Sequence, residues 1–170
     1  AGRYLKIELL GISSSFDFVF DKLTFKAQTS VTNEAPALAS TTDPLVRDIY
    51  EVGLNTLKEC MQTVYEDGPK RDRRLWIGDL YLEALANAYT FKNHELTKYC
   101  LYLLAAFAND EGLLHATLLE KPQPHPQYGT HTLDYCLIYN VALLEYLKET
   151  GDMETANDLW PCLLYTSPSP

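Results

Sequence analysis

The sequence predicts a mainly α-helical fold that follows a short β segment. Side chains alternate between apolar and polar over residues 4–9, which is typical of a half-buried strand. After residue 43, apolar residues recur at spacings of three and four, which is typical of amphipathic helices. A chain of 170 residues with 46% hydrophobic and 22% charged side chains has the composition of a globular protein. We therefore expect strands first and paired helices afterwards.

Residues 1–28 form the β segment. The alternating run Tyr4–Leu9 is followed by turn residues at 11–15, and Phe16–Asp21 then places three phenylalanines on one face. Because an isolated pair of strands is marginal in water, we interpret this segment as the end of a sheet whose other strands lie upstream. The chain is therefore expected to be a fragment of a longer protein.

Residues 29–43 are rich in Thr, Ser, Ala and Pro and are predicted to be a linker. Asp43 and Pro44 then favour the start of a helix, since Asp caps free N–H groups and Pro is tolerated in the first turn. The helical pattern is predicted over about 44–66, 80–91, 95–109 and 132–148, and again after Gly151-Asp152. Residues 110–130 form a long connection, and loops of this length are usually functional or disordered. Residues 163–170 continue no helical pattern and are interpreted as a non-native or disordered tail.

Charge and composition exclude some classes of partner. The 23 acidic residues outnumber the 14 basic ones, which argues against a protein that binds nucleic acid through its phosphates. No apolar run approaches the ~20 residues that cross a bilayer, so no membrane partner is expected. No signal peptide is visible, and both a cytoplasmic and a secreted location stay open. The four cysteines are interpreted as reduced core residues.

No metal or other cofactor is predicted. His115, His125 and His131 lie in or beside the long connection, but their spacing matches no ligand motif.

Residues 66–79 stand out chemically. They read Glu-Asp-Gly-Pro-Lys-Arg-Asp-Arg-Arg-Leu-Trp-Ile-Gly-Asp. Carboxylates accept hydrogen bonds from sugar hydroxyls, Arg orients them, and an indole face stacks on C–H groups. A carboxylic acid among apolar neighbours can also deliver a proton to a glycosidic oxygen. The alternative interpretation is a charged turn with salt bridges to solvent, because exposed charge runs are common.

This motif, from Asp67 to Asp79, resembles the signature of bacterial α-L-rhamnosidases, glycoside hydrolase family 78. A second run, 146–152, together with Ala156 and residues 159–161, resembles a helix-turn-helix motif of their barrel and of related barrels. Residues 3–8 resemble the end of the β-sandwich domain that precedes the barrel. The resemblance implies a β-sandwich end over 1–28 and the N-terminal part of an (α/α)6 six-hairpin barrel over 44–162.

The resemblance also implies roles for individual residues. Asp72 matches the general acid, although the family often has Glu there. Asp67 and Asp79 match acidic positions that hold sugar hydroxyls, and Arg71 and Trp76 match neighbours that shape the pocket. The implied reaction is inverting hydrolysis of a terminal α-L-rhamnoside, so the expected partner is a carbohydrate substrate. The general base is a Glu from the later half of the barrel, which no motif here matches, so the fragment alone is expected to be inactive.

Weaker candidates lie around the long connection. Tyr128 and His131 could add stacking and polar contacts to the substrate cleft, and Asp134 and Tyr135 are similarly placed. Glu83, one turn after Asp79, is interpreted as a helix-surface charge or as a partner behind the site. Two alternatives stay open: a six-hairpin hydrolase of another sugar, and a non-catalytic carbohydrate-binding helical scaffold.

Overall fold

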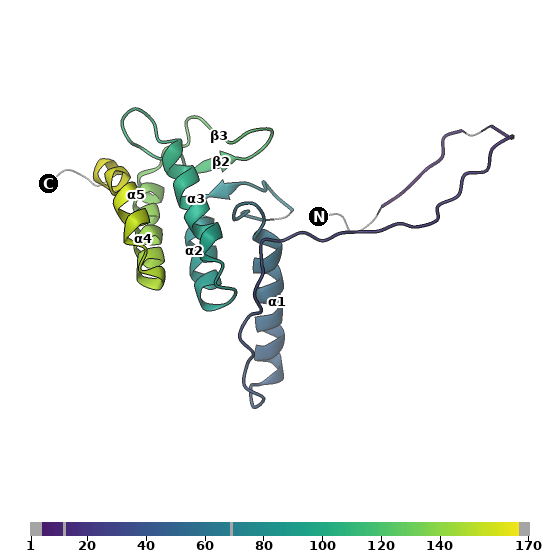
Figure 1. Ribbon diagram of the computed structural model, residues 1–170, viewed down its shortest axis with the longest axis horizontal. Helices are drawn as coiled ribbons and strands as arrows, with labels where there is room; N and C mark the ends of the chain where they lie inside the picture. Colours follow the sequence, from purple (N-terminus) through teal and green to yellow (C-terminus); the bar gives the residue numbers. More distant parts are fainter. Residues whose placement is uncertain (1–4, 12, 69, 167–170) are drawn as a thin grey trace.

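The computed structural model describes residues 5–11, 13–68 and 70–166. Within them, five helices and three short strands follow one another along the chain (Figure 1). The helices are α1 (Pro44–Cys60), α2 (Ile77–Tyr89), α3 (His94–Ala106), α4 (Leu133–Thr150) and α5 (Met153–Thr166). The strands are β1 (Leu75–Trp76), β2 (Thr117–Leu119) and β3 (His125–Pro126). The expectation of a mainly helical fold is confirmed.

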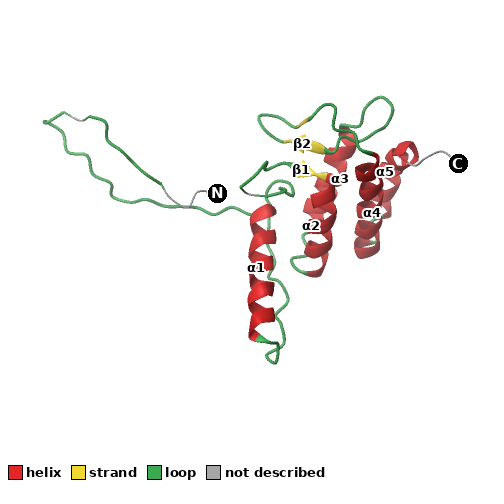
Figure 2. Ribbon diagram, turned by 180° about the vertical axis from the view of Figure 1, so that it is seen from behind, coloured by secondary structure: helices red, strands yellow, loops and turns green. Residues whose placement is uncertain are grey.

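Helices α2 to α5 share one hydrophobic core. Leu80 of α2, Leu101 of α3 and Leu143 of α4 are all buried in it. The Tyr139 hydroxyl of α4 donates to the Leu101 carbonyl at 3.0 Å, which joins α4 to α3 through a buried polar contact. Short turns join α2 to α3 and α4 to α5, and a longer connection joins α3 to α4. The four helices run up and down side by side (Figure 2). No helix in the described part of the chain is long and apolar enough to cross a membrane.

Helix α1 begins where the sequence predicts and ends earlier. The Asp43 carboxylate accepts from the Leu45 N–H at 2.8 Å, so Asp43 is the N-cap. The helix ends at Cys60, and the following chain turns back so that Met61 and Tyr65 form an isolated β-bridge. Val64 is fully buried, but in this loop and not in a helix. Its apolar spacing reflects burial in the core, which the sequence pattern could not distinguish from a longer helix.

The predicted linker, residues 29–43, runs alongside α1 (Figure 1). The Tyr50 hydroxyl donates to the Pro36 carbonyl at 2.8 Å, and the Arg47 guanidinium donates to the Ala39 carbonyl at 3.1 Å. These bonds fix the linker against the helix that it precedes.

The three strands form a small antiparallel sheet in the order β1-β2-β3. Trp76 pairs with Thr117 across the first ladder, and Leu118 pairs with Pro126 across the second. The sheet lies at the end of the bundle where α2 and α4 begin and α3 ends (Figure 2). The long connection 110–130 is therefore neither plain nor disordered, since it supplies two of the three strands.

The N-terminal segment differs from the expectation. Residues 5–11 and 13–28 contain no strand and run away from the helices and back (Figure 1). Their large apolar side chains are exposed, Leu5, Phe18 and Phe25 among them. The expected strands at 4–9 and 16–21 are not formed, because a strand needs a ladder partner and an apolar face to cover. Residues 1–4 and 12 lie outside the described residues, and the assignment to a β-sandwich stays a prediction.

The C-terminal segment corrects a second expectation. Helix α5 continues through Pro161 to Thr166, so residues 163–166 extend a helix that the sequence pattern had ended. Leu is a strong helix former, and the two leucines after Cys162 suit this continuation. Residues 167–170 of the predicted tail lie outside the described residues.

Candidate functional site

The loop between α1 and β1 is built on Asp67. Its side chain is 1% exposed, and its Oδ1 accepts from the Arg74 backbone N–H at 3.0 Å. The Asp67 N–H in turn donates to the Arg74 carbonyl at 3.0 Å. These two bonds close the loop at its base, so Asp67 ties the beginning of the loop to Arg74 at its end.

The tip of the same loop is exposed. The Arg71 guanidinium donates to Asp67 Oδ2 at 3.1 Å, although the Arg71 side chain is 71% exposed. Asp72 is exposed, and its carboxylate has no hydrogen bond or ion pair with the residues that the structure describes. Pro69, which belongs to the sequence motif, lies outside them. The tip therefore presents a carboxylate that is available to bind a ligand, because it stabilises no part of the described fold.

An open pocket of about 250 Å³ lies beneath this tip. Its lining consists of Asp67, Arg71, Asp72, Trp76, Asp79 and Tyr135. The five side chains that the family resemblance assigned to the site thus meet in one pocket, together with a tyrosine from the start of α4. A salt-bridged turn would have directed these side chains apart into solvent. The Trp76 and Tyr135 rings meet edge to face, with centroids 6.3 Å apart.

Asp79 lies in the first turn of α2, directly below the loop. Burial raises the pKa of its carboxyl, and the nearby Asp67 carboxylate raises it further, while the Arg71 guanidinium opposes them. Two carboxylates and one guanidinium therefore set the charge at the floor of the pocket. This arrangement favours a neutral ligand rich in hydroxyls over an anion.

Glu83 lies one helical turn further into the protein. Burial raises its pKa to about 8, opposed by a hydrogen bond with the Cys60 thiol, and Asp79 and Asp67 raise it further. Its Oε2 is buried without a hydrogen-bond partner among the described residues. The interpretation of Glu83 as a helix-surface charge is therefore wrong. It is a buried carboxyl behind the floor of the pocket, and it is protonated at neutral pH.

A second pocket, of about 430 Å³, lies at the same end of the bundle. His115, His125, Tyr128 and His131 line it, together with Gly129, Pro126 and residues 106–110. The weaker candidates Tyr128 and His131 are thus brought together in this pocket. Asp134 is exposed in the first turn of α4 and lines neither pocket in the described part of the chain.

Among the residues that line the first pocket, Tyr135 lies outside the motif of residues 67–79, and it is predicted from the sequence only as a weaker candidate. Its hydroxyl packs against Gly78, where an added Cβ would lie 3.1 Å from it. The glycine in the Trp-Ile-Gly-Asp motif therefore makes room for this tyrosine, a contact that the motif alone could not reveal.

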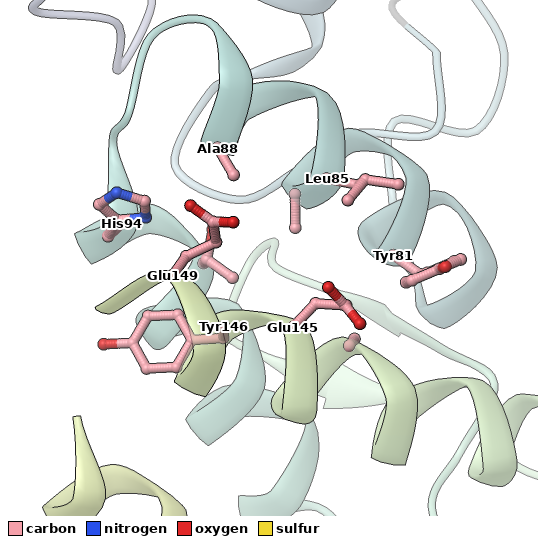
Figure 3. Close-up of a pocket in the computed structure, with 10 residues that line it drawn as sticks. Tyr81, Leu85, Ala88, His94, Glu145, Tyr146 and Glu149 are labelled. Carbon is pink, nitrogen blue, oxygen red and sulfur yellow. The ribbon is translucent and has the colours of Figure 1, made fainter. Parts of the chain in front are cut away.

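A separate small cavity lies among α2, α3 and α4, away from the loop (Figure 3). Tyr81, His94, Tyr146 and Glu149 contribute to its wall. Its volume of about 20 Å³ admits a single water molecule and no sugar. It is a packing defect between helices and not a substrate site.

Residues 5–11, 13–68 and 70–166 contain no cluster of metal-ligating side chains. No group of three or more His, Cys, Asp or Glu side chains there could hold a metal ion. Cys60, Cys100 and Cys136 are buried free thiols, as the sequence predicts.

The described helices pair side by side, and carboxylates and two aromatic rings line the pocket at one end of them. The family model of the bacterial alpha-L-rhamnosidase six-hairpin glycosidase domain matches residues 35–166. The chain belongs to this family, which confirms the resemblance and the fold class that it implied.

Two solved structures are similar to the chain. One is a rhamnosidase from Klebsiella oxytoca with rhamnose bound, with 44% sequence identity and a TM-score of 0.77 over 81% of this chain. The other is a family GH78 rhamnosidase from Bacillus sp. GL1, with 26% identity and a TM-score of 0.70 over 80% of this chain. The chain spans 26% of the first protein and 13% of the second. No curated protein sequence matches it.

Proposed function

We propose that the full-length protein containing this chain is an inverting α-L-rhamnosidase that uses Asp72 as its general acid. The single observation that carries the proposal is the pocket in which Asp72 meets Asp67, Trp76 and Asp79. The rhamnose bound to the Klebsiella oxytoca rhamnosidase supports the same class of ligand.

In this proposal, each of the lining residues makes a different contact with the sugar. Asp79 and Asp67 accept hydrogen bonds from the sugar hydroxyls, and the Trp76 indole packs against a C–H face of the ring. Arg71 orients the Asp67 carboxylate through their 3.1 Å bond. The sugar is thereby held with its anomeric carbon toward the exposed tip of the loop.

Asp72, which lines the same pocket, is the proposed general acid of the reaction. Its carboxylic acid donates a proton to the glycosidic oxygen as the C1–O bond breaks, so the leaving group departs as an alcohol. A water molecule attacks C1 from the opposite face and loses a proton to a general base, which inverts the configuration.

The base must lie about 6.5–9.5 Å from the acid to leave room for that water. The family resemblance puts it on a Glu of a later helix, outside the matched motif. We therefore expect the 170-residue chain by itself to be inactive.

The surfaces of the outer helices support a longer barrel. Helix α1 exposes Leu45, Ile49 and Val52 along one side, and α4 exposes Leu133, Leu137 and Val141. Such stripes are normally covered by neighbouring helices. A six-hairpin barrel would supply those neighbours on both sides.

The experiment is hydrolysis of p-nitrophenyl α-L-rhamnoside by the full-length protein, followed by proton NMR of the fresh product. The proposal predicts turnover and initial release of β-L-rhamnose. Initial release of the α anomer would contradict inversion. Absence of turnover with rhamnosides, but turnover with another glycoside, would favour a six-hairpin hydrolase of another sugar.

A further inference from the structure

Arg73 joins the exposed tip of the loop to β1 in an unusual backbone conformation. Its φ is 53°, in the left-handed region that favours glycine and that other residues enter at a cost. In the turn before it, the Arg71 N–H donates to the Gly68 carbonyl at 3.2 Å, and Asp72 is the last residue of this turn. A left-handed residue after a turn redirects the chain, as it does at the end of many helices. Arg73 therefore directs the chain from the turn that carries Asp72 into the strand that carries Trp76.

The chain is held firmly on the β1 side of Arg73. Arg74 and Asp67 exchange two hydrogen bonds at 3.0 Å, one to the Asp67 carboxylate and one between the backbones. The Arg74 guanidinium also donates to the side chain of Gln127, the residue after β3, at 2.6 Å. Because these three bonds fix Arg74, a change in the φ of Arg73 must move the tip of the loop rather than the strand.

The Arg73 side chain does not line the pocket that Asp72 lines. It lines a separate open cavity with Glu66 and Lys121, and the two share no lining residue among those described. Burial raises the pKa of the Glu66 carboxyl, and the charges of Arg73 and Lys121 oppose this. The Arg73 guanidinium therefore attracts the Glu66 carboxylate at the base of the loop. This attraction favours the tight turn that the left-handed φ of Arg73 opposes.

We propose that Arg73 is a positioning residue for the general acid: its left-handed backbone, held by the attraction of its guanidinium to Glu66, keeps Asp72 in the first pocket. This inference rests on the proposed function, because there must be an acid to position. A general acid has to lie within hydrogen-bond reach of the glycosidic oxygen. A relaxed turn therefore slows proton transfer more than it weakens sugar binding, since Trp76 and Asp79 belong to β1 and α2 and do not move with the tip.

The test compares two amides at this position in the full-length protein. Glutamine and asparagine both remove the charge, but asparagine enters the left-handed region more readily. Arg73→Gln should lower kcat for a rhamnosyl-glucose disaccharide about fivefold, the effect of losing an exposed ion pair, and leave KM unchanged. Arg73→Asn should keep the wild-type rate, because it holds the turn without the ion pair. Arg73→Lys keeps the charge and should do the same.

A second substrate separates positioning of the acid from a general effect on the fold. Fluoride departs from α-L-rhamnosyl fluoride with little need of a proton, so all three variants should hydrolyse it at the wild-type rate. Lys92 is the matched control, since it is exposed, has a φ of 55° and lies between α2 and α3, where it lines no part of the first pocket. Lys92→Gln and Lys92→Asn should leave both rates unchanged.

Hydrogen exchange of the peptide that spans residues 67–74 reports on the turn without turnover. The peptide should exchange faster in Arg73→Gln than in the wild type, and at the wild-type rate in Arg73→Asn. Unchanged exchange or an unchanged disaccharide rate in Arg73→Gln would overturn the positioning role. Equal losses for the two amides, or equal losses on the two substrates, would overturn it as well. A wild-type disaccharide rate for Asp72→Asn would instead contradict the proposed function, and the inference with it.

Discussion

The base and the tip of the loop between α1 and β1 carry the same kind of side chain in opposite settings. At the base, Asp67 is buried and bonded through both oxygens to Arg74 and Arg71. At the tip, Asp72 is exposed and has no partner among the described residues. The motif therefore contains aspartates with two different roles, one structural and one proposed to act on the substrate. The base holds the loop in shape, and the tip offers a carboxylate to the substrate.

The largest effect is expected at the tip. Asp72→Asn should lower kcat for a rhamnosyl-glucose disaccharide by about 10²–10⁴-fold, because that is the usual contribution of a general acid. The exposed side chain makes no described contact, so the denaturant midpoint should stay at the wild-type value. Turnover near the wild-type rate would sink the general-acid role. A large loss of stability would show that the tip also supports the fold.

At the base of the loop, substitution of Asp67 should lower the stability of the protein, whereas substitution of Asp72 should not. Asp67→Ala leaves the partly buried Arg74 N–H without an acceptor, which should lower the free energy of unfolding by about 1–3 kcal/mol. Asp67→Asn keeps a carbonyl oxygen for that N–H and loses the ion pair with the exposed Arg71, so its loss should be smaller. Urea unfolding of the two variants measures the difference. Equal stability of both variants and the wild type would refute the anchoring role.

The buried Glu83 carboxyl should make the free energy of unfolding depend on pH. Its pKa is about 8 in the folded protein against an ordinary value of 4.5, so the folded state retains a proton that the unfolded chain has lost between these values. Wild-type stability therefore receives its full Glu83 contribution below pH 4.5 and loses it as the pH rises to about 8. Glu83→Gln has no such proton to lose, so its stability relative to the wild type should increase across this window and level off above it.

The measurement is chemical denaturation of both proteins from pH 4.5 to pH 9. Glu154→Gln, at an exposed position in the first turn of α5, is the matched control and should run parallel to the wild type. A Glu83→Gln curve that also ran parallel to the wild type would place Glu83 in solvent.

The smallest effect is expected at Gly78. An alanine Cβ there would lie 3.1 Å from the Tyr135 hydroxyl, so the tyrosine must shift by a few tenths of an ångström at the pocket wall. We expect a several-fold rise in KM with little change in kcat. Gly53→Ala, in α1 with nothing within 4 Å, should leave KM unchanged and add roughly 0.5–1 kcal/mol of stability. Identical kinetics for the two variants would show that Tyr135 does not shape the pocket.

The helices could be predicted because their signals are local. Asp43 and Gly151 mark a beginning and an end in the sequence itself, and the structure has an N-cap at Asp43 and a left-handed C-cap at Gly151, with φ of 69°. The end of α1 could not be predicted, because Val64 is buried without being helical. The sheet was missed because strands of two or three residues have no detectable period.

The same distinction explains how much of the site the sequence revealed. Asp67, Arg71, Asp72, Trp76 and Asp79 belong to one continuous motif, so recognising the motif located them together. Tyr135 and His115 reach the same end of the bundle only through the packing of α4 and the pairing of β2 with β1. Contacts between distant segments leave no pattern in a single sequence. The buried setting of Glu83 was missed for that reason too, since Cys60, with which it shares a hydrogen bond, belongs to another helix.

The central claim is that Asp72 protonates the leaving group, and the most direct test is its dependence on leaving-group chemistry. Fluoride departs from α-L-rhamnosyl fluoride with little need of a proton, whereas the alcohol of a rhamnosyl disaccharide requires one. For Asp72→Asn in the full-length protein, the account predicts a rate on the fluoride within about tenfold of the wild type and a loss of at least about 10²-fold on the disaccharide. Equal losses on both substrates would contradict it.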